Sequence, residues 1–545
     1  MRSHSTRWRA ALGRAVVASP HPLATMAGLQ AMLRGGTAVD AAVAAGATLA
    51  VVYPHMTGLG GDSFWLCWDA RQRCLRGLAA CGAAAAGATP ALYRAQGLDA
   101  IPSRGPLAAL TVPGAVDGLW EAHRWSREAL GSPLPWGDLL ADAIRHAAAG
   151  FAISVGQLVE RDRAVEWLAR EDPAFHGFRQ TYLVDDRDPA GIMPLAQPRL
   201  GRTLERLARE GGRAFYEGEL AAEIGRACEA VGSPLRAADL AAHRSRWVEP
   251  ITMPYRGGLA ASLPPPSQGL ALLAILGMLE AIDLEFAHAW SLSPQYVHVV
   301  VEATKLAFAD RDRWLADPDV VAVPTARLLD PAYLRARATE IRMDAAAPAP
   351  VPSGLGGTVA CVAADPSGHA VSLIQSLYHE WGSGVMAGET GVVLQNRGVA
   401  FTLDPTHPNV LAPGKRPFHT LTPFMWLHAG GPALVAGTMG GDGQPQTLAA
   451  LTTRVVDHPQ EVQRAVEAPR WLWGRTWGAP RRGLSIEERF GQPRVRSLRA
   501  LGHEVTVLPA WSPTMGHAQA IVRDPERALW IGAGDPRADG PALGA

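Results

Sequence analysis

The sequence predicts an α+β protein, because helical and strand patterns alternate along the chain. Apolar residues recur at helical spacing between residues 112 and 246. Two apolar runs, 358–364 and 370–377, flank the turn sequence DPSG and predict a β-hairpin. In that turn, proline presets φ and glycine permits positive φ. The two kinds of pattern together favour a mixed fold that contains antiparallel strands.

The remaining elements are predicted from local composition and from glycine and proline residues that mark turns. In chain order, the patterns predict a strand and helix over 14–30 and a helix over 36–53. A glycine-rich turn is predicted over 56–64, directly before the apolar strand FWLCW. A strand over 255–263 and helices over 270–284 and 294–312 follow. Beyond residue 358, strands and turns alternate, with one helix predicted near 457–468. Residues 348–357, PAPVPSGLGG, have the composition of an exposed linker.

Thr358 directly follows this linker and opens the first strand of the hairpin. If the Gly357–Thr358 peptide bond were cut, Thr358 would carry a hydroxyl nucleophile and a free α-amine to accept its proton. That is the activation chemistry of N-terminal-threonine hydrolases. The same Gly-Gly-Thr sequence occurs at residues 35–37, but there an alanine-rich run follows, and Thr37 is predicted to be the N-cap or a first-turn residue of a helix. Context therefore separates the two threonines.

Composition excludes several classes of function. The 545 residues contain 51 Lys+Arg and 51 Asp+Glu, so no net charge attracts nucleic acid or an anionic membrane, and neither partner is expected. Five cysteines without a CxxC pair give neither a disulfide framework nor a zinc signature, and we expect no metal or cofactor. The basic N-terminus lacks the apolar segment of a secretory signal, and no apolar run approaches the ~20 residues of a membrane span. A cytoplasmic location is therefore expected.

Seven short motifs are spread along the chain. They are GLGGDSF at 58–64, VPGAVDG at 112–118, PPPSQG at 264–269, ADRDRWLADPD at 309–319, GSG at 382–384, MGG at 439–441 and GDPRADG at 534–540. With the hairpin that Thr358 opens, they resemble the γ-glutamyltransferase (γ-glutamyltranspeptidase) family of self-cleaving N-terminal nucleophile hydrolases. The resemblance implies an αββα sandwich of two antiparallel sheets between helical layers. It also implies a large subunit, 1–357, and a small subunit, 358–545, intertwined in one fold.

The resemblance further implies roles for individual residues. Thr358 is the nucleophile, and Gly440 and Gly441 match the glycine pair whose N–H groups form the family's oxyanion hole. Ser376 stands near the nucleophile, where threonine is usual, and keeps a hydroxyl that can assist self-cleavage. Thr420 matches a hydroxyl residue of the substrate pocket, and His419 beside it is expected to line that pocket.

Three polar anchors for a γ-glutamyl group are missing from this sequence. The family's carboxylate-binding arginine should fall within residues 78–88, which contain no arginine. Ala400 takes the place of the family's acidic residue, and Tyr378 takes the place of its asparagine, so Tyr378 is expected at the substrate site. An α-ammonium buried there would lack a counter-charge, at a cost of several kcal/mol. Arg397 stands where relatives carry glutamine, and it is the candidate clamp for a carboxylate.

Several functions remain open at this stage. The favoured one is a self-processing amidohydrolase for a small carboxylate-bearing amide, since SLYHEWGSG and QNRG resemble the branch that includes oxamate amidohydrolase. The alternatives are γ-glutamyl hydrolysis or transfer on glutathione-like substrates, a cephalosporin-acylase-like amidase, and a non-catalytic binding scaffold. Lys415 or Arg416 would be the clamp if Arg397 is not. Ser267 is expected either to contribute to the pocket or to cap a helix.

Overall fold

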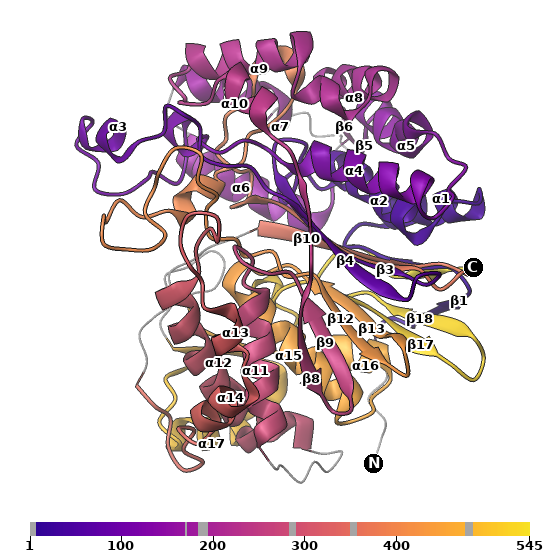
Figure 1. Ribbon diagram of the computed structural model, residues 1–545, viewed down its shortest axis with the longest axis vertical. Helices are drawn as coiled ribbons and strands as arrows, with labels where there is room; N and C mark the ends of the chain where they lie inside the picture. Colours follow the sequence, from indigo (N-terminus) through magenta and orange to yellow (C-terminus); the bar gives the residue numbers. More distant parts are fainter. Residues whose placement is uncertain (1–6, 169–171, 184–193, 283–289, 349–356, 475–482) are drawn as a thin grey trace.

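Two antiparallel β-sheets pack face to face between two layers of helices (Figure 1). The computed structural model describes residues 7–168, 172–183, 194–282, 290–348, 357–474 and 483–545. This arrangement confirms the α+β class and the αββα sandwich. Most of the predicted linker, residues 349–356, lies outside the described residues.

Each large sheet contains seven of the described strands, and every neighbouring pair is antiparallel. The first has the order β1 (Ala11–Gly13), β18 (Leu529–Ala533), β17 (Ala518–Asp524), β13 (Gly431–Thr438), β12 (Phe424–His428), β9 (Gly258–Ser262) and β8 (Ile251–Tyr255). The second has the order β19 (Leu543–Gly544), β2 (Val16–Ala18), β10 (Gly357–Ala364), β11 (Ala370–Tyr378), β3 (Asp62–Asp69), β4 (Cys74–Ala80) and β7 (Arg246–Val248). Strands from before and after Thr358 therefore occur in both sheets.

The helices form an outer layer on each sheet (Figure 1). On the second sheet, α2 packs against β10 and β11, and α4 packs against β3 and β4. On the first sheet, α11 packs against β8 and β9, α15 against β13, and α16 against β17 and β18. These five helices are α2 (Ala38–Val52), α4 (Ala115–Glu128), α11 (Gly269–Ala281), α15 (Gln444–Val456) and α16 (Val462–Glu467).

Further elements surround these layers. The other described helices are α1 (Pro22–Leu33), α3 (Pro90–Arg94), α5 (Trp136–Ala149), α6 (Val155–Leu168), α7 (His176–Tyr182), α8 (Pro198–Glu210), α9 (Gly218–Ala230), α10 (Ala237–Ala242), α12 (Pro294–Trp314), α13 (Thr325–Leu328), α14 (Pro331–Ala338) and α17 (Gln492–Ala500). Two small sheets pair β5 (Phe151–Ala152) with β6 (Pro194–Leu195), and β15 (Leu484–Glu487) with β14 (Trp471–Trp473) and β16 (Val505–Leu508). Within the part of the chain that is described, no helix has the length and apolarity needed to cross a membrane.

The sandwich explains why the strands around Thr358 are apolar along their whole length. Strands β10 and β11 are buried at every position, with helix α2 on one face and the first sheet on the other. Such strands give continuous apolar runs instead of alternating ones. The space between the sheets is filled by apolar side chains from both, among them Phe64, Leu66, Ile374, Met425, Val435, Ile521 and Trp530.

Most sequence predictions of local structure are confirmed. Thr37 caps α2, where its hydroxyl accepts from the N–H groups of Val39 and Asp40 and the Asp40 carboxylate completes a capping box. The glycine-rich turn before β3 also fits its prediction, because a side chain on Gly61 would collide with the backbone carbonyl of Ser376.

Two helices after residue 358 were missed, and this part of the prediction was wrong. Helix α15 is buried continuously from Gln444 to Arg454, and its buried positions include polar residues such as Gln446 and Thr452, so the buried face is not visible as an apolar pattern. Helix α17 buries only Val495 and Leu498, too few apolar residues to give a helical pattern.

The β10–β11 hairpin contains an irregularity beside Thr358. The DPSG turn closes with the Gly368 N–H donating to the Asp365 carbonyl at 3.0 Å. Near the other end, Gly357 pairs with Tyr378 while Val359 pairs with Gln375, so β11 carries one extra residue. Such a bulge bends the strand and changes the direction of its side chains. Tyr378 takes φ of +79°, a conformation that non-glycine residues rarely adopt.

Candidate active site

The bulge places Ser376 next to Thr358 and the preceding carbonyl group. Thr358 is 1% exposed, and its Oγ1 lies 2.7 Å from the Gly357 carbonyl oxygen and 3.3 Å from Ser376 Oγ. Ser376 Oγ donates its hydrogen to the same carbonyl and accepts from the Tyr378 N–H at 2.7 Å. A hydroxyl has one hydrogen to donate. The Ser376 hydrogen therefore polarises the carbonyl that Thr358 would attack.

Arg397 connects Ser376 to a second hydroxyl residue. It begins the short 3₁₀ turn Arg397–Ala400 and is fully buried. Its Nη2 donates to Ser376 Oγ at 3.2 Å, and its Nη1 donates to Thr420 Oγ1 at 3.0 Å. The guanidinium carbon lies 4.2 Å from the centre of the Tyr378 ring. Four candidate residues that are far apart in sequence thus form one contiguous group with Thr358.

The Arg397 guanidinium has no carboxylate at ion-pairing distance among the described residues, and its buried Nε has no hydrogen-bond partner there. Burial lowers the pKa of Arg397 to about 10, opposed by the charge of Asp62. Burial raises the pKa of Asp62 to about 7, opposed by Arg397 and by hydrogen bonds from Gln395, Gly114 and Gly82. Arg397 is therefore a buried cation without a full counter-charge near neutral pH.

His419 holds the second oxygen of the Asp62 carboxyl group. Its Nε2 lies 3.2 Å from Asp62 Oδ2, while its Nδ1 accepts from the Leu421 N–H at 3.4 Å. Burial lowers the pKa of His419 well below its usual value, so the ring is neutral and carries its proton on Nε2. His419 packs against Phe64, with 4.4 Å between ring centres. Its side-chain contacts are thus with Asp62, Leu421 and Phe64.

A cavity of about 510 Å³ adjoins this group of residues. Tyr378 and Ala400, the positions where the glutamyl anchors are missing, both line it, together with Arg311 and Phe418. Thr358 and Arg397 do not line it, and the ring of Tyr378 lies against the Arg397 guanidinium. In the uncut chain, Tyr378 therefore lies between the cavity and the buried cation.

Gly440 and Gly441 follow β13 and have φ of +131° and +52°. Gly441 begins a 3₁₀ turn, Gly441–Gly443, that leads into α15. The first N–H groups of such a turn have no acceptor within it and can donate to a ligand. A buried glutamine, Gln268, connects this loop to the Arg397 group by donating to the carbonyl oxygens of Gly441 and Thr420, each at 2.8 Å.

Comparisons with known proteins identify the family of this chain. A family model described as gamma-glutamyltranspeptidase matches residues 24–545. The chain belongs to the γ-glutamyltranspeptidase family. It is similar to the oxamate amidohydrolase proenzyme of Klebsiella pneumoniae, with 45% identity over 96% of this chain and 97% of that one. It is also similar to the glutathione hydrolase-like YwrD proenzyme of Bacillus subtilis, with 42% identity over 97% and 98%.

The structure is similar to that of cephalosporin acylase from Bacillus halodurans, with a TM-score of 0.91 and 32% identity over 100% of this chain and 98% of the other. The chain is therefore an enzyme, an N-terminal nucleophile amidohydrolase of the γ-glutamyltranspeptidase family.

Three buried residues of the site were not singled out from the sequence. They are Asp62, Gln268 and Arg311, and they lie in the family motifs GLGGDSF, PPPSQG and ADRDRWLADPD. The motifs were visible, but which of their side chains faces the site depends on the tertiary structure. Ser267 donates to the Leu421 carbonyl at 2.6 Å and accepts from the Gly269 N–H at the start of α11, so it anchors this helix.

The two alternative carboxylate clamps already have partners. Lys415 Nζ donates to the carbonyl oxygens of Pro408 and Val410. Arg416 forms an ion pair with Asp317, with 2.6 Å between Nη2 and Oδ1. Arg397 lacks such a partner, and it also contacts Ser376, so it remains the stronger candidate.

One other cluster has the residue types of a metal site. His298, Glu302 and His503 are buried with their ligand atoms within 4.8 Å of one another. However, the two histidines hydrogen-bond to each other at 2.8 Å, and Lys305 Nζ lies 2.7 Å from Glu302 Oε1. The lysine already supplies the positive charge that this carboxylate needs, and it opposes binding of a second cation. The cluster fits a hydrogen-bonded network better than a metal centre.

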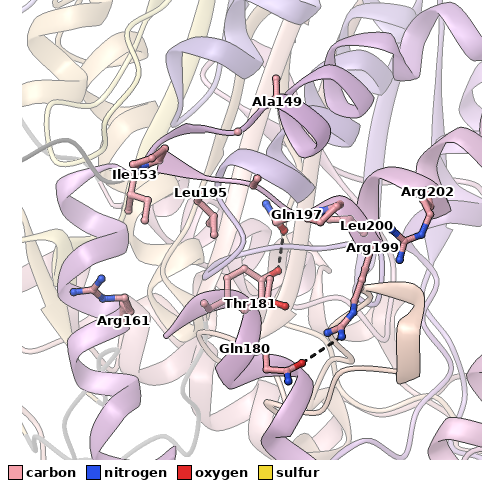
Figure 2. Close-up of a pocket in the computed structure, with 16 residues that line it drawn as sticks. Ala149, Ile153, Arg161, Gln180, Thr181, Leu195, Gln197, Arg199, Leu200 and Arg202 are labelled. Carbon is pink, nitrogen blue, oxygen red and sulfur yellow. Dashed lines mark hydrogen bonds between the residues drawn. The ribbon is translucent and has the colours of Figure 1, made fainter. Parts of the chain in front are cut away.

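A second cavity, of about 670 Å³, lies between α7, α8 and β6 (Figure 2). Arg161, Arg199 and Arg202 line it, and Arg199 donates to Gln180 at 3.2 Å. None of its lining residues belongs to the candidate active site.

We predict that Ser376→Ala slows cleavage of the Gly357–Thr358 bond by about 10²-fold, the cost typical of losing one donor to a developing oxyanion. Ser376→Thr keeps the hydroxyl and should cleave nearly normally. The fraction of cut chain over time on a denaturing gel measures the rate, and Thr358→Ala should remain a single chain. Ser372→Ala is the matched control, since Ser372 lies on the same strand and donates to a distant carbonyl, that of Ala436. Equal rates for the two alanine variants would contradict this role of Ser376.

Proposed function

We propose that this enzyme is a self-processing N-terminal-threonine amidohydrolase that hydrolyses a small, carboxylate-bearing amide of the oxamate type. The observation that carries the proposal is Arg397, a fully buried guanidinium that contacts Ser376 and has no ion-paired acid among the described residues. A buried charge without a partner costs several kcal/mol, and a bound carboxylate would recover that energy.

The first step is processing of the chain itself. Thr358 Oγ1 attacks the Gly357 carbonyl carbon, the C–N bond breaks as the hydroxyl proton passes to the Thr358 nitrogen, and the acyl group moves to oxygen as an ester. Water then hydrolyses the ester, giving a large subunit, 1–357, and a small subunit, 358–545, which stay together through their shared sheets. The new α-amine of Thr358 is free to serve as the base. Release of Gly357 also removes the sheet pairing that faces Tyr378, and we infer that this gives the cavity access to Thr358.

Turnover repeats this chemistry on a small amide. The Thr358 hydroxyl attacks the substrate carbonyl while the α-amine takes the hydroxyl proton. The N–H groups of Gly440 and Gly441 stabilise the oxyanion, and the proton passes to the departing amine. Water then hydrolyses the acyl-threonine ester and restores the enzyme. Ser376 and Thr420, which hold Arg397, orient the carboxylate clamp beside the nucleophile.

The same features disfavour a γ-glutamyl substrate. Its α-ammonium would lie near the Arg397 cation, and Ala400 and Tyr378 supply no anionic acceptor. Oxamate has a carboxylate next to its amide and no ammonium group, so it satisfies Arg397 without requiring the missing anchors. The similarity to the oxamate amidohydrolase proenzyme of Klebsiella pneumoniae supports the same substrate class.

We predict that the processed enzyme has a kcat/KM for oxamate that is about 10²-fold or more higher than its kcat/KM for glutathione. Each charge-assisted contact that glutathione lacks in this site is worth ~1.5–3 kcal/mol. Ammonia release measures oxamate and glutamine hydrolysis, and amine release measures cleavage of glutathione and of a cephalosporin acid. Equal or faster cleavage of glutathione would contradict the proposal. A chain that stays uncut and cleaves none of the four would support the binding scaffold instead.

We also predict that carboxylate binding weakens as pH rises through about 7. Asp62, whose pKa burial raises to about 7, is neutral below that pH and anionic above it, whereas Arg397 stays charged because its pKa is about 10. Ionised Asp62 partly neutralises Arg397, so the Ki of oxalate should rise about tenfold between pH 6 and 8, equivalent to ~1.4 kcal/mol of charge interaction.

Two controls accompany this measurement. Asp62→Asn should flatten the pH profile of the oxalate Ki, because the titrating group is gone. The Ki of neutral oxamide should vary little with pH in either protein. If the oxalate Ki falls as pH rises, or if Asp62→Asn leaves the pH profile of the oxalate Ki unchanged, the titrating group is not Asp62.

A further inference from the structure

Gln268 joins the two halves of the active site. Its side chain is fully buried at the start of α11. Its amide nitrogen donates to the carbonyl oxygens of Gly441 and Thr420, each at 2.8 Å, and its backbone N–H donates to the His419 carbonyl at 2.9 Å. Gly441 belongs to the loop 439–443, which we name the oxyanion loop, and Thr420 holds the Arg397 clamp.

Arg311 fixes the orientation of the Gln268 amide. Arg311 Nη1 lies 3.0 Å from Gln268 Oε1 and 3.1 Å from Asp442 Oδ1. A guanidinium only donates, so the amide oxygen must face Arg311 and both amide hydrogens must face the two carbonyl groups. Arg311 is itself held between the rings of Phe308 and Phe418, at 3.9 Å and 5.4 Å from their centres. A rotation of the amide by 180° would place its hydrogens against the guanidinium.

The oxyanion loop needs such external restraint. Gly440 and Gly441 both have positive φ and no side chain, so their local conformation is weakly constrained by sequence alone. Gln268 holds the Gly441 carbonyl, and Arg311 holds the adjacent Asp442 side chain. The conformation of the loop is therefore restrained by Gln268, which directly precedes α11, and by Arg311 in α12, both far away in sequence.

We propose that Gln268 and Arg311 are positioning residues that hold the oxyanion loop in the conformation needed for substrate turnover. The inference rests on the proposed function and extends it. Ser376, not the loop, donates to the Gly357 carbonyl in the uncut chain. Self-cleavage and turnover thus use different donors to the oxyanion, and only turnover depends on Gln268.

The test compares Gln268→Glu with the wild-type enzyme. Glutamate has the same shape and can still pair with Arg311, but it has no hydrogen to donate to Gly441 or Thr420. We expect complete self-cleavage, a kcat for oxamate lowered about 10²-fold and a KM within threefold of wild type, since the loss is in oxyanion stabilisation. Arg311→Lys keeps the charge but loses the planar guanidinium, so its kcat should lie between those of wild type and Gln268→Glu.

Gln460→Glu is the matched control, because Gln460 donates to Ser291 Oγ at 2.8 Å, also across the cleavage point but outside the active-site group. It should keep the wild-type kcat. A normal kcat in Gln268→Glu, or a loss that falls entirely in KM, would overturn the proposal.

A second measurement needs no substrate, so it separates this proposal from the proposed function. Backbone hydrogen exchange in residues 439–443 should be at least tenfold faster in processed Gln268→Glu than in wild type, because the loop loses its restraint. Exchange in the β10–β11 hairpin should be unchanged. Unchanged exchange in the loop would overturn the positioning role even if the physiological substrate is not oxamate.

Discussion

The active site depends on one buried charge, the guanidinium group of Arg397. It contacts the hydroxyl groups of Ser376 and Thr420, yet no described carboxylate pairs with it. Burial lowers its pKa only to about 10, so it stays charged at neutral pH. A protein interior tolerates such a charge when a ligand completes it. In the proposed function, this cation selects an anionic ligand, and its contacts with Ser376 and Thr420 place it beside Thr358.

The surrounding fold keeps this cation close to the nucleophile. The extra residue in β11 places Ser376 opposite Thr358, and Tyr378 follows with positive φ and covers Arg397. Gln268 then extends the network from Thr420 to Gly441. A single network of hydrogen bonds thus joins the nucleophile, the carboxylate clamp and the oxyanion loop. Its members come from both sides of the proposed cleavage point, so we expect the two pieces to remain associated after processing.

Local sequence patterns gave the hairpin, the Thr37 cap and the long helices α1, α2, α11 and α12. They failed for α15, because its buried positions include polar residues, and for α17, because it buries only two apolar residues. Family motifs gave Thr358, Ser376, Arg397 and the glycine pair as candidates.

The same motifs did not indicate that Asp62 and His419 form a hydrogen-bonded pair, or that Gln268 faces the oxyanion loop. Those contacts join residues 357 and 173 positions apart in the chain. A one-dimensional pattern does not encode them.

The most direct test of this account is the ratio of kcat/KM for oxamate to that for oxamide, its neutral analogue of nearly equal size. In processed wild-type enzyme the ratio should be about 10² or more, since a charge-assisted contact to a buried guanidinium is worth ~1.5–3 kcal/mol. Arg397→Ala should still cleave its own chain, but its ratio should fall close to one. The ratio for Arg397→Lys should lie between those of wild type and Arg397→Ala. An equal ratio in wild type and Arg397→Ala would contradict the central claim.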